Sequence, residues 1–208
     1  MNKMNYQKEL DKVIQRCVEQ NSVPSLFLHA CCAPCSSYCL EYLSEYFNIT
    51  VFYYNPNISV KEEYEYRLNE EKRLISLMNF KNPVSIIEGE YTPHRFFDVV
   101  KGLENEPEGG RRCAECFRLR LGESAKKAKE LGFDYFTTTL TISPLKNADL
   151  LNQIGEQLGR KYGVKWLFSD FKKREGYKRS IVLSHKYELY RQNYCGCIFS
   201  KAKAPSDS

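Results

Sequence analysis

The chain has 208 residues, of which 42% are hydrophobic and 27% charged, and its formal net charge is +5. This length suits one domain with its own hydrophobic core, so disulfides are not needed to hold the chain together. Residues 1–20 are polar and lack the apolar core of a signal peptide, and no stretch approaches the roughly 18 apolar residues of a membrane span. We therefore expect a soluble cytoplasmic protein without membrane contact, which excludes membrane-spanning proteins and disfavours secreted disulfide scaffolds.

The two halves of the chain differ in charge. Residues 1–110 contain 11 basic and 16 acidic residues, a net charge of −5, whereas residues 111–208 contain 20 and 10, a net charge of +10. The densest basic run, residues 171–179, has five bases and two aromatic residues around a glycine, which suits contact with RNA phosphates and bases. The same composition is typical of a solvated helix start, and both interpretations stay open at this point.

Apolar residues follow strand-like and helical periods in alternation along the chain. In chain order, the first half predicts a helix over 5–20, a strand over 25–30, a helix over 35–46, a strand over 49–54, a long helix from 59 and a strand over 84–87. The second half predicts a loop over 102–110, a helix over 114–131, a strand over 133–141, a helix over 147–162 and a strand over 164–168. The long helix is expected to open with a capping box formed by Ser59 and Glu62.

This alternation of strands and helices implies a parallel sheet that is covered on both faces. We therefore expect an α/β fold in which residues 1–200 form a single catalytic domain, built on a mostly parallel, Rossmann-like sheet with helices on both faces. Residues 201–208 are polar and are predicted to form a disordered tail.

Seven of the nine cysteines fall into three tight groups. These are Cys31-Cys32-Ala-Pro-Cys35, Cys113-Ala-Glu-Cys116 and Cys195-Gly-Cys197. A chain that uses cysteine only as a small hydrophobic residue has no reason to cluster it. In the reducing cytoplasm, clustered thiols are more often metal ligands or redox groups than structural bridges. The pattern therefore indicates thiolate chemistry.

The first group lies where a predicted strand turns into a helix, and the backbone N–H groups and dipole of a helix start stabilise thiolates. A nucleotide-binding turn would contain glycines, but residues 30–37 have none, which disfavours ATP binding. Thiolates from two groups can each take one iron of a cube-shaped iron–sulfur cluster. The four candidate ligands are Cys31, Cys32, Cys113 and Cys116.

A zinc site is the alternative. Structural zinc sites with four cysteines usually combine two Cys-x2-Cys knuckles, and only Cys113 and Cys116 have this spacing. Adjacent cysteines such as Cys31 and Cys32 do not easily form a knuckle around one tetrahedral ion, but they can reach different irons of a larger cluster. Spacing therefore favours iron–sulfur over zinc.

Cys195 and Cys197 flank a single glycine. If oxidised, they would close a small strained ring, and strained disulfides are the labile, redox-active kind. The alternative is that both are further metal ligands, with Cys35 as a third. His29, just before the first group, is typical of a hydrogen-bonded core residue, while a proton-donor role stays open.

At these residues the sequence closely resembles the QueH type of epoxyqueuosine reductase. The motifs that carry the resemblance are His29-Ala-Cys-Cys-Ala-Pro-Cys35, Tyr54-Asn-Pro-Asn-Ile58, Arg112-Cys-Ala-Glu-Cys-Phe117, residues 136–147 and Tyr190-Arg-Gln-Asn-Tyr-Cys-Gly-Cys-Ile-Phe-Ser200. The resemblance implies an oxidoreductase that reduces the epoxide of epoxyqueuosine to give queuosine at the wobble position of tRNA, the last step of queuosine biosynthesis. The implied partners are the tRNA anticodon stem-loop and an external electron donor such as a ferredoxin or flavodoxin.

The resemblance also implies which residues do the chemistry. It implies a [4Fe-4S] cluster bound by Cys31, Cys32, Cys113 and Cys116. It implies a catalytic redox disulfide between Cys195 and Cys197, or an additional iron bound by this pair with Cys35. Two other functions stay open as alternatives: a zinc-stabilised RNA-binding module and an ATP-dependent tRNA-modifying enzyme.

Overall fold

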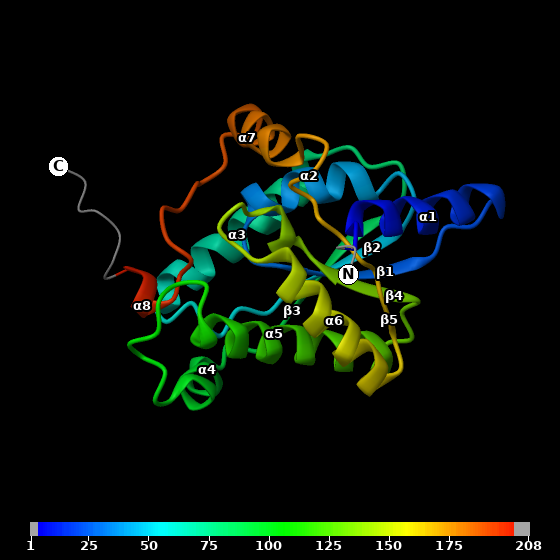
Figure 1. Cartoon of the computed structure of the whole chain (residues 1–208). Helices are drawn as coiled ribbons and strands as arrows, with labels where there is room; N and C mark the ends of the chain where they lie inside the picture. The colour runs from blue at the N-terminus through cyan, green and yellow to red at the C-terminus, as the bar shows by residue number, and fades with distance from the viewer. Residues whose placement is uncertain (1–3, 202–208) are drawn as a thin grey trace.

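The structure is a computed structural model that describes residues 4–201. Five parallel strands form one sheet in the order β3-β2-β1-β4-β5 (Figure 1). They are β1 (Ser25–Ala30), β2 (Asn48–Tyr53), β3 (Val84–Glu88), β4 (Tyr135–Thr138) and β5 (Lys165–Trp166). The chain moves outward from β1 to β3 and then crosses to the other side of β1, so the sheet has a topological switch point between β1 and β4. The predicted α/β fold with a parallel, Rossmann-like sheet is confirmed.

Helices cover both faces of this sheet (Figure 1). One face carries α1 (Tyr6–Glu19), α2 (Ala33–Leu43) and α3 (Lys61–Leu77), and α7 (Gly176–Lys186) packs on α2. The other carries α5 (Arg111–Glu130) and α6 (Ala148–Tyr162), and α4 (Pro93–Val100) packs on α5. Two short helical turns complete the fold, η1 (Thr139–Ile142) after β4 and α8 (Ile198–Lys201) beside α4 and α5. Within residues 4–201, no helix has both the length and the apolarity needed to cross a membrane.

Alternate residues of each strand supply two separate cores. Leu26 and Leu28 of β1 pack into the core under α1, α2 and α3. Phe27, between them, faces the opposite way and packs with Phe136 of β4 into the core under α5 and α6. Both sides of the strand are fully buried, which explains why β1 has a continuous apolar run in the sequence.

The second half of the chain differs from the prediction in several places. The strand predicted over 133–141 ends at Thr138, whose hydroxyl accepts the Leu140 N–H over 3.2 Å and opens η1. The strand predicted over 164–168 is reduced to the two residues of β5, which pair only with the start of β4. The sequence pattern does not predict α4 and α7.

Two smaller predictions concern element ends. The capping box at Ser59 and Glu62 is wrong, because α3 begins at Lys61 after Val60, an N-cap residue without a side-chain hydrogen bond. Of the tail predicted over 201–208, Lys201 is the last residue of α8, and the remainder lies outside the described residues.

Two helix glycines give a matched test of the packing between the helices and the sheet. A Cβ on Gly155 of α6 would lie 2.3 Å from the ring of Trp166, whereas a Cβ on Gly122 of α5 would meet only Leu158, at 3.8 Å. We expect Gly155→Ala to lower the free energy of unfolding by about 1–3 kcal/mol through overpacking. Gly122→Ala should raise it by up to about 1 kcal/mol through helix propensity. Urea denaturation measures both, and equal effects would contradict this packing.

Candidate functional site

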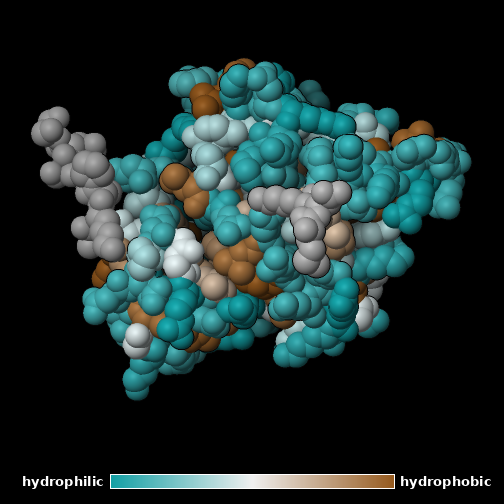
Figure 2. Space-filling view, viewed as in Figure 1, coloured by the Kyte–Doolittle hydropathy of each residue, from teal (hydrophilic) through white to brown (hydrophobic). Residues whose placement is uncertain are grey.

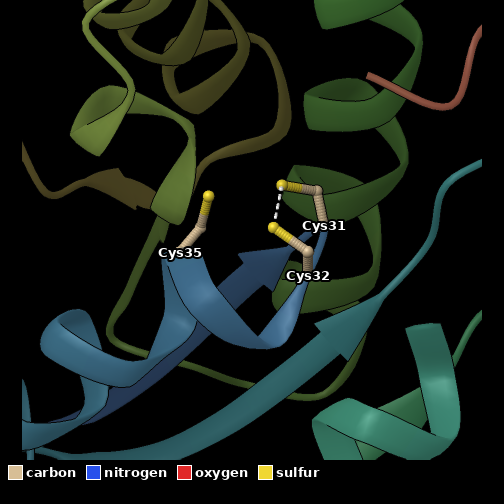
Figure 3. A group of neighbouring side chains, drawn as sticks. All are labelled: Cys31, Cys32 and Cys35. Atoms are coloured by element: carbon tan, nitrogen blue, oxygen red, sulfur yellow. Dashed lines mark hydrogen bonds between the residues drawn. The ribbon is translucent and has the colours of Figure 1, made fainter. Parts of the chain in front are cut away.

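The first cysteine group lies at the carboxyl end of β1, beside the switch point. Cys31 follows the strand directly, Cys32 is the N-cap residue of α2, and Cys35 lies in the first turn of that helix. The three sulfur atoms lie within 4.8 Å of one another, and those of Cys31 and Cys32 are 3.6 Å apart. Figure 3 shows the three side chains pointing to the same side of the turn. The predicted strand-to-helix turn is confirmed, and Cys35 joins the pair as a third possible metal ligand.

Cys31 is the most acidic thiol of this group. The thiols of Cys32 and Cys35 donate toward its sulfur and hold the pKa of Cys31 well below its usual range. Burial acts in the opposite direction, and the nearby cations Arg120 and Lys146 lower this pKa further. The same contact with Cys31 raises the pKa of Cys32 to about 12, and it raises that of Cys35 as well. A thiolate that two neighbouring thiols stabilise is ready to bind a metal.

The second group begins α5. Cys113 and Cys116 are three residues apart near the start of the helix, and the Gly109 N–H donates to the Cys113 sulfur over 3.3 Å. Burial raises the pKa of Cys116 to about 12, although the nearby Arg120 acts in the opposite direction. Without a metal, this thiol is therefore protonated near neutral pH.

The third group reaches α5 because the chain crosses the carboxyl edge of the sheet after α7. Arg67 of α3 holds this segment by donating to the carbonyls of Cys195 and Tyr194 over 3.3 Å and 3.4 Å. Gly196 has a φ of +99°, and a Cβ there would lie 2.7 Å from Ile58, so the position requires glycine. All nine cysteines are free thiols, and the disulfide between Cys195 and Cys197 stays a prediction.

Two adjoining cavities connect the three groups. The smaller is lined by Cys113, Cys116, Cys195 and Cys197. The larger, of about 500 Å³, is lined by Cys31, Cys35 and Cys195. Cys195, Arg120 and Lys146 lie on both. Six of the clustered cysteines thus line the two cavities, and Cys32 lies buried against Cys31. Such a set of sulfur donors can bind a metal or exchange electrons as dithiols.

His29 is a core residue with both ring nitrogens occupied. Its Nε2 lies 3.1 Å from the Tyr54 carbonyl, which can only accept, so Nε2 carries the proton. Its Nδ1 lies 2.8 Å from Thr138 Oγ1 and accepts from that hydroxyl. Burial, with a smaller effect of Arg120, lowers the pKa of His29 to about 3. This neutral ring fits the predicted core role and does not fit a proton donor.

Sequence reasoning missed two residues that hold the site together. Asn55, just after β2, donates from Nδ2 to the Ala30 carbonyl over 2.9 Å and accepts from Arg120 at Oδ1. Both residues are buried. Asn55 has a sequence signal, because it follows a predicted strand at the same edge of the sheet as Cys31. Arg120 has no such sequence signal. It is one of 31 basic residues, and the charge pattern of its helix does not distinguish it from the others.

Comparison with known proteins identifies relatives over nearly the whole chain. The profile of the family described as Epoxyqueuosine reductase QueH matches residues 26–203. The chain is 46% identical to a protein of that name from Staphylococcus epidermidis, over 99% of this chain and 88% of the relative. It is 44% identical to one from Streptococcus pyogenes, over 95% and 78%. It is 34% identical to one from Thermotoga maritima, over 85% and 90%.

Glu71 of α3 gives a pH-dependent prediction. Its carboxyl is fully buried, and neither oxygen has a hydrogen-bond partner within residues 4–201. Burial raises its pKa from 4.5 to about 8. The fold therefore favours the neutral form of Glu71 over the charged form. The resulting contribution to the free energy of unfolding is fully present below pH 4.5 and is lost as the pH rises through about 8.

We expect Glu71→Gln to remove this loss. Between these two pKa values, the wild type should lose stability relative to the variant by up to about 1.4 kcal/mol per pH unit. The measurement is the free energy of unfolding from urea titrations at several pH values. Glu65→Gln, on the exposed side of the same helix, is the matched control. Parallel pH profiles for wild type and Glu71→Gln would show that Glu71 is ionised in the fold.

Proposed function

The chain belongs to the epoxyqueuosine reductase QueH family, and from this we propose that it reduces the epoxide of epoxyqueuosine to the alkene of queuosine at the wobble position of tRNA. The reaction consumes two electrons and two protons and releases the epoxide oxygen as water. The structural observation that carries the proposal is the convergence of three cysteine groups beside the switch point of the sheet. The electrons come from an external donor of the ferredoxin or flavodoxin type, and the reduced thiols suit a cytoplasmic location.

We propose a [4Fe-4S] cluster as the cofactor. The proposed ligands are Cys31, Cys32, Cys113 and Cys116. Their site gathers several sulfur donors, and the buried guanidinium of Arg120 has an Nε atom without a partner within residues 4–201, as expected beside an anionic thiolate cluster. When bound, the cluster supplies electrons to the substrate. The two sulfurs of the first pair, now 3.6 Å apart, would separate on binding different irons of the cluster, and the adjacency of Cys31 and Cys32 in the sequence, not this distance, favours a cluster over a zinc knuckle.

Cys195 and Cys197 are proposed as the catalytic redox pair. Cys195 supports this role because it lies on both cavities and is within reach of electrons from one and substrate in the other. The Nδ2 atom of Asn57 lies 3.9 Å from the sulfur of Cys195 and 3.4 Å from the carbonyl oxygen of Cys195. These two contacts fix the position of the Cys195 side chain. Cys35 lines the same larger cavity, and this observation favours the second candidate role, in which all three bind an additional iron.

The modified base is proposed to enter the larger cavity. Its volume of about 500 Å³ lies within the ordinary range of ligand sites. An anticodon base must leave its stack to reach such a cavity. The rim offers Tyr177 and Tyr194 for contact with the base and the exposed Arg191 for contact with a phosphate. The face of the molecule drawn in Figure 2 is largely hydrophilic, with an apolar area near its centre, as suits an RNA partner.

The basic run over 171–179 contributes less to RNA binding than its composition indicates. Four of its five bases form ion pairs, which are Lys172 with Asp170, Arg174 with Asp11, Lys178 with Glu175 and Arg179 with Glu41. Phe171 is buried in the core and cannot stack on a base. Within the described part of the chain, Lys173 is the base of this run without a carboxylate partner. It lines a polar cavity of about 440 Å³ together with Lys146, so we propose these two lysines as phosphate contacts.

The first prediction from this function concerns the cysteines. Cys31→Ala, Cys32→Ala, Cys113→Ala and Cys116→Ala should each lose most of the cluster iron and nearly all reductase activity, because each change removes one ligand. Cys195→Ser and Cys197→Ser should keep iron and sulfide but stop turnover, because serine cannot form the disulfide. Iron, sulfide and zinc analysis of anaerobically purified protein, with mass spectrometry of the tRNA product, measures both effects.

Cys17→Ala is the matched control, since Cys17 is buried in α1 within the core of the sheet face that α1 covers. Full iron and sulfide in any variant of the first four would remove that residue from the ligand set. Loss of about one iron per chain at constant sulfide in the last two would assign them to a mononuclear iron. A colourless wild-type protein with stoichiometric zinc and no reductase activity would support the RNA-binding alternative.

The second prediction concerns tRNA. Lys173→Glu, alone and with Lys146→Glu, should weaken binding of an anticodon stem-loop and lower the slope of log K against log salt by about 0.7 for each phosphate that the variant no longer neutralises. Lys81→Glu is the control, because Lys81 is exposed before β3, at the opposite edge of the sheet. Binding assays at four salt concentrations measure the slopes. Equal slopes for all variants would place the RNA elsewhere.

A further inference from the structure

Arg120 is a buried cation without an acidic partner. It projects from α5 at the boundary of the two cavities, and only 1% of its surface is exposed. Within residues 4–201 it forms no ion pair with a carboxylate. Its one hydrogen bond to oxygen goes to Asn55 Oδ1, and its Nε has no partner. A buried arginine almost always has a paired anion, because its charge is costly to remove from water.

The partner at position 55 is an amide, and its geometry is fixed. Asn55 Nδ2 donates to the Ala30 carbonyl over 2.9 Å, so Oδ1 is the atom turned toward Arg120. An amide oxygen accepts the hydrogen bond as a carboxylate would, but it leaves the positive charge of the guanidinium uncompensated. The chain thus retains a full positive charge at the end of β1.

Among the described residues, no carboxylate is paired with this charge, and Glu108, which lines both cavities, is exposed to solvent. Glu71 is held in its neutral form by burial, which raises its pKa to about 8. His29 is neutral, and Lys146, on the same two cavities, adds a second positive charge. The available anions are cysteine sulfurs. The sulfurs of Cys116 and Cys195 line the smaller cavity together with Arg120, and that of Cys31 lines the larger one.

We propose that Arg120 is the fixed counter-charge of the iron–sulfur cluster and that it raises the reduction potential of the cluster, with Asn55 as the residue that positions it and leaves it charged. This inference rests on the proposed function. An added electron makes a thiolate-bound cluster more negative, and a fixed cation beside it in a low-dielectric site favours that state. Arg120 is a positioning residue here, since it acts through the cluster and not on the substrate.

The experiment is a redox titration of the full chain with its cluster, followed by electron paramagnetic resonance. Arg120→Gln should shift the midpoint potential to a more negative value, and Arg120→Lys, which keeps the charge, should shift it less. Asn55→Asp should also make it more negative, because a carboxylate then neutralises the unchanged guanidinium. A purely structural role for Arg120 predicts no difference in midpoint potential between Arg120→Gln and Arg120→Lys when both retain full iron and sulfide.

Arg118→Gln is the matched control, because Arg118 lies on the same helix but is exposed and paired with Glu115. Its midpoint potential should equal that of the wild type. Wild-type potentials in Arg120→Gln and Asn55→Asp, with full iron and sulfide, would overturn the inference and leave the proposed function intact. If Arg120→Gln takes up no cluster, Asn55→Asp and Arg120→Lys decide by the same criteria. A wild-type protein without iron and sulfide would overturn the proposed cofactor and this inference with it.

Discussion

A single hydrogen-bonded connection joins the parts of the chain that carry the chemistry. The Ala30 carbonyl ends β1, Asn55 follows β2, and Arg120 lies one turn beyond Cys116 on α5. These three residues come from distant parts of the sequence, and every member is buried. Since breaking either hydrogen bond would leave further buried polar groups without partners, which costs free energy, the connection fixes the distance between the first and second cysteine groups. The parallel sheet supplies the rest of the constraint, because it places the ends of β1 and β2 at one edge.

The third cysteine group depends on contacts of a different kind. Its segment has no regular secondary structure between α7 and α8, so its backbone groups need partners from elsewhere. Arg67 and Asn57 satisfy the Cys195 carbonyl, and Ser59 donates to the Gly196 carbonyl over 3.4 Å. Elements next to β2 thus bind the segment that carries Cys195 and Cys197, and they hold it beside the other two cysteine groups.

Much of the fold could be predicted because its signals are local. Apolar periods identify β1, β2, β3 and most helices, and the turn from β1 into α2 follows from one strand and Pro34. Features that depend on distant partners could not be predicted. Arg174 and Arg179 pair with Asp11 and Glu41, which are 163 and 138 residues away, so the composition of the run could not decide between an RNA surface and a solvated helix start. The start of α7 is hidden for another reason, because its N-cap residue Glu175 has a φ of +60°, which no capping pattern marks.

The same distinction applies to the site. Cysteine spacing identifies the reactive groups, because adjacent thiols are rare without chemistry, but it says nothing about the charges around them. Those charges result from burial, which keeps His29 and Glu71 neutral while Arg120 and Lys146 stay positive. A site with fixed cations and neutral acids stabilises any negative charge that enters it. Thiolates, added electrons and RNA phosphates all carry negative charge, so one electrostatic arrangement would serve both the proposed cofactor and the proposed substrate.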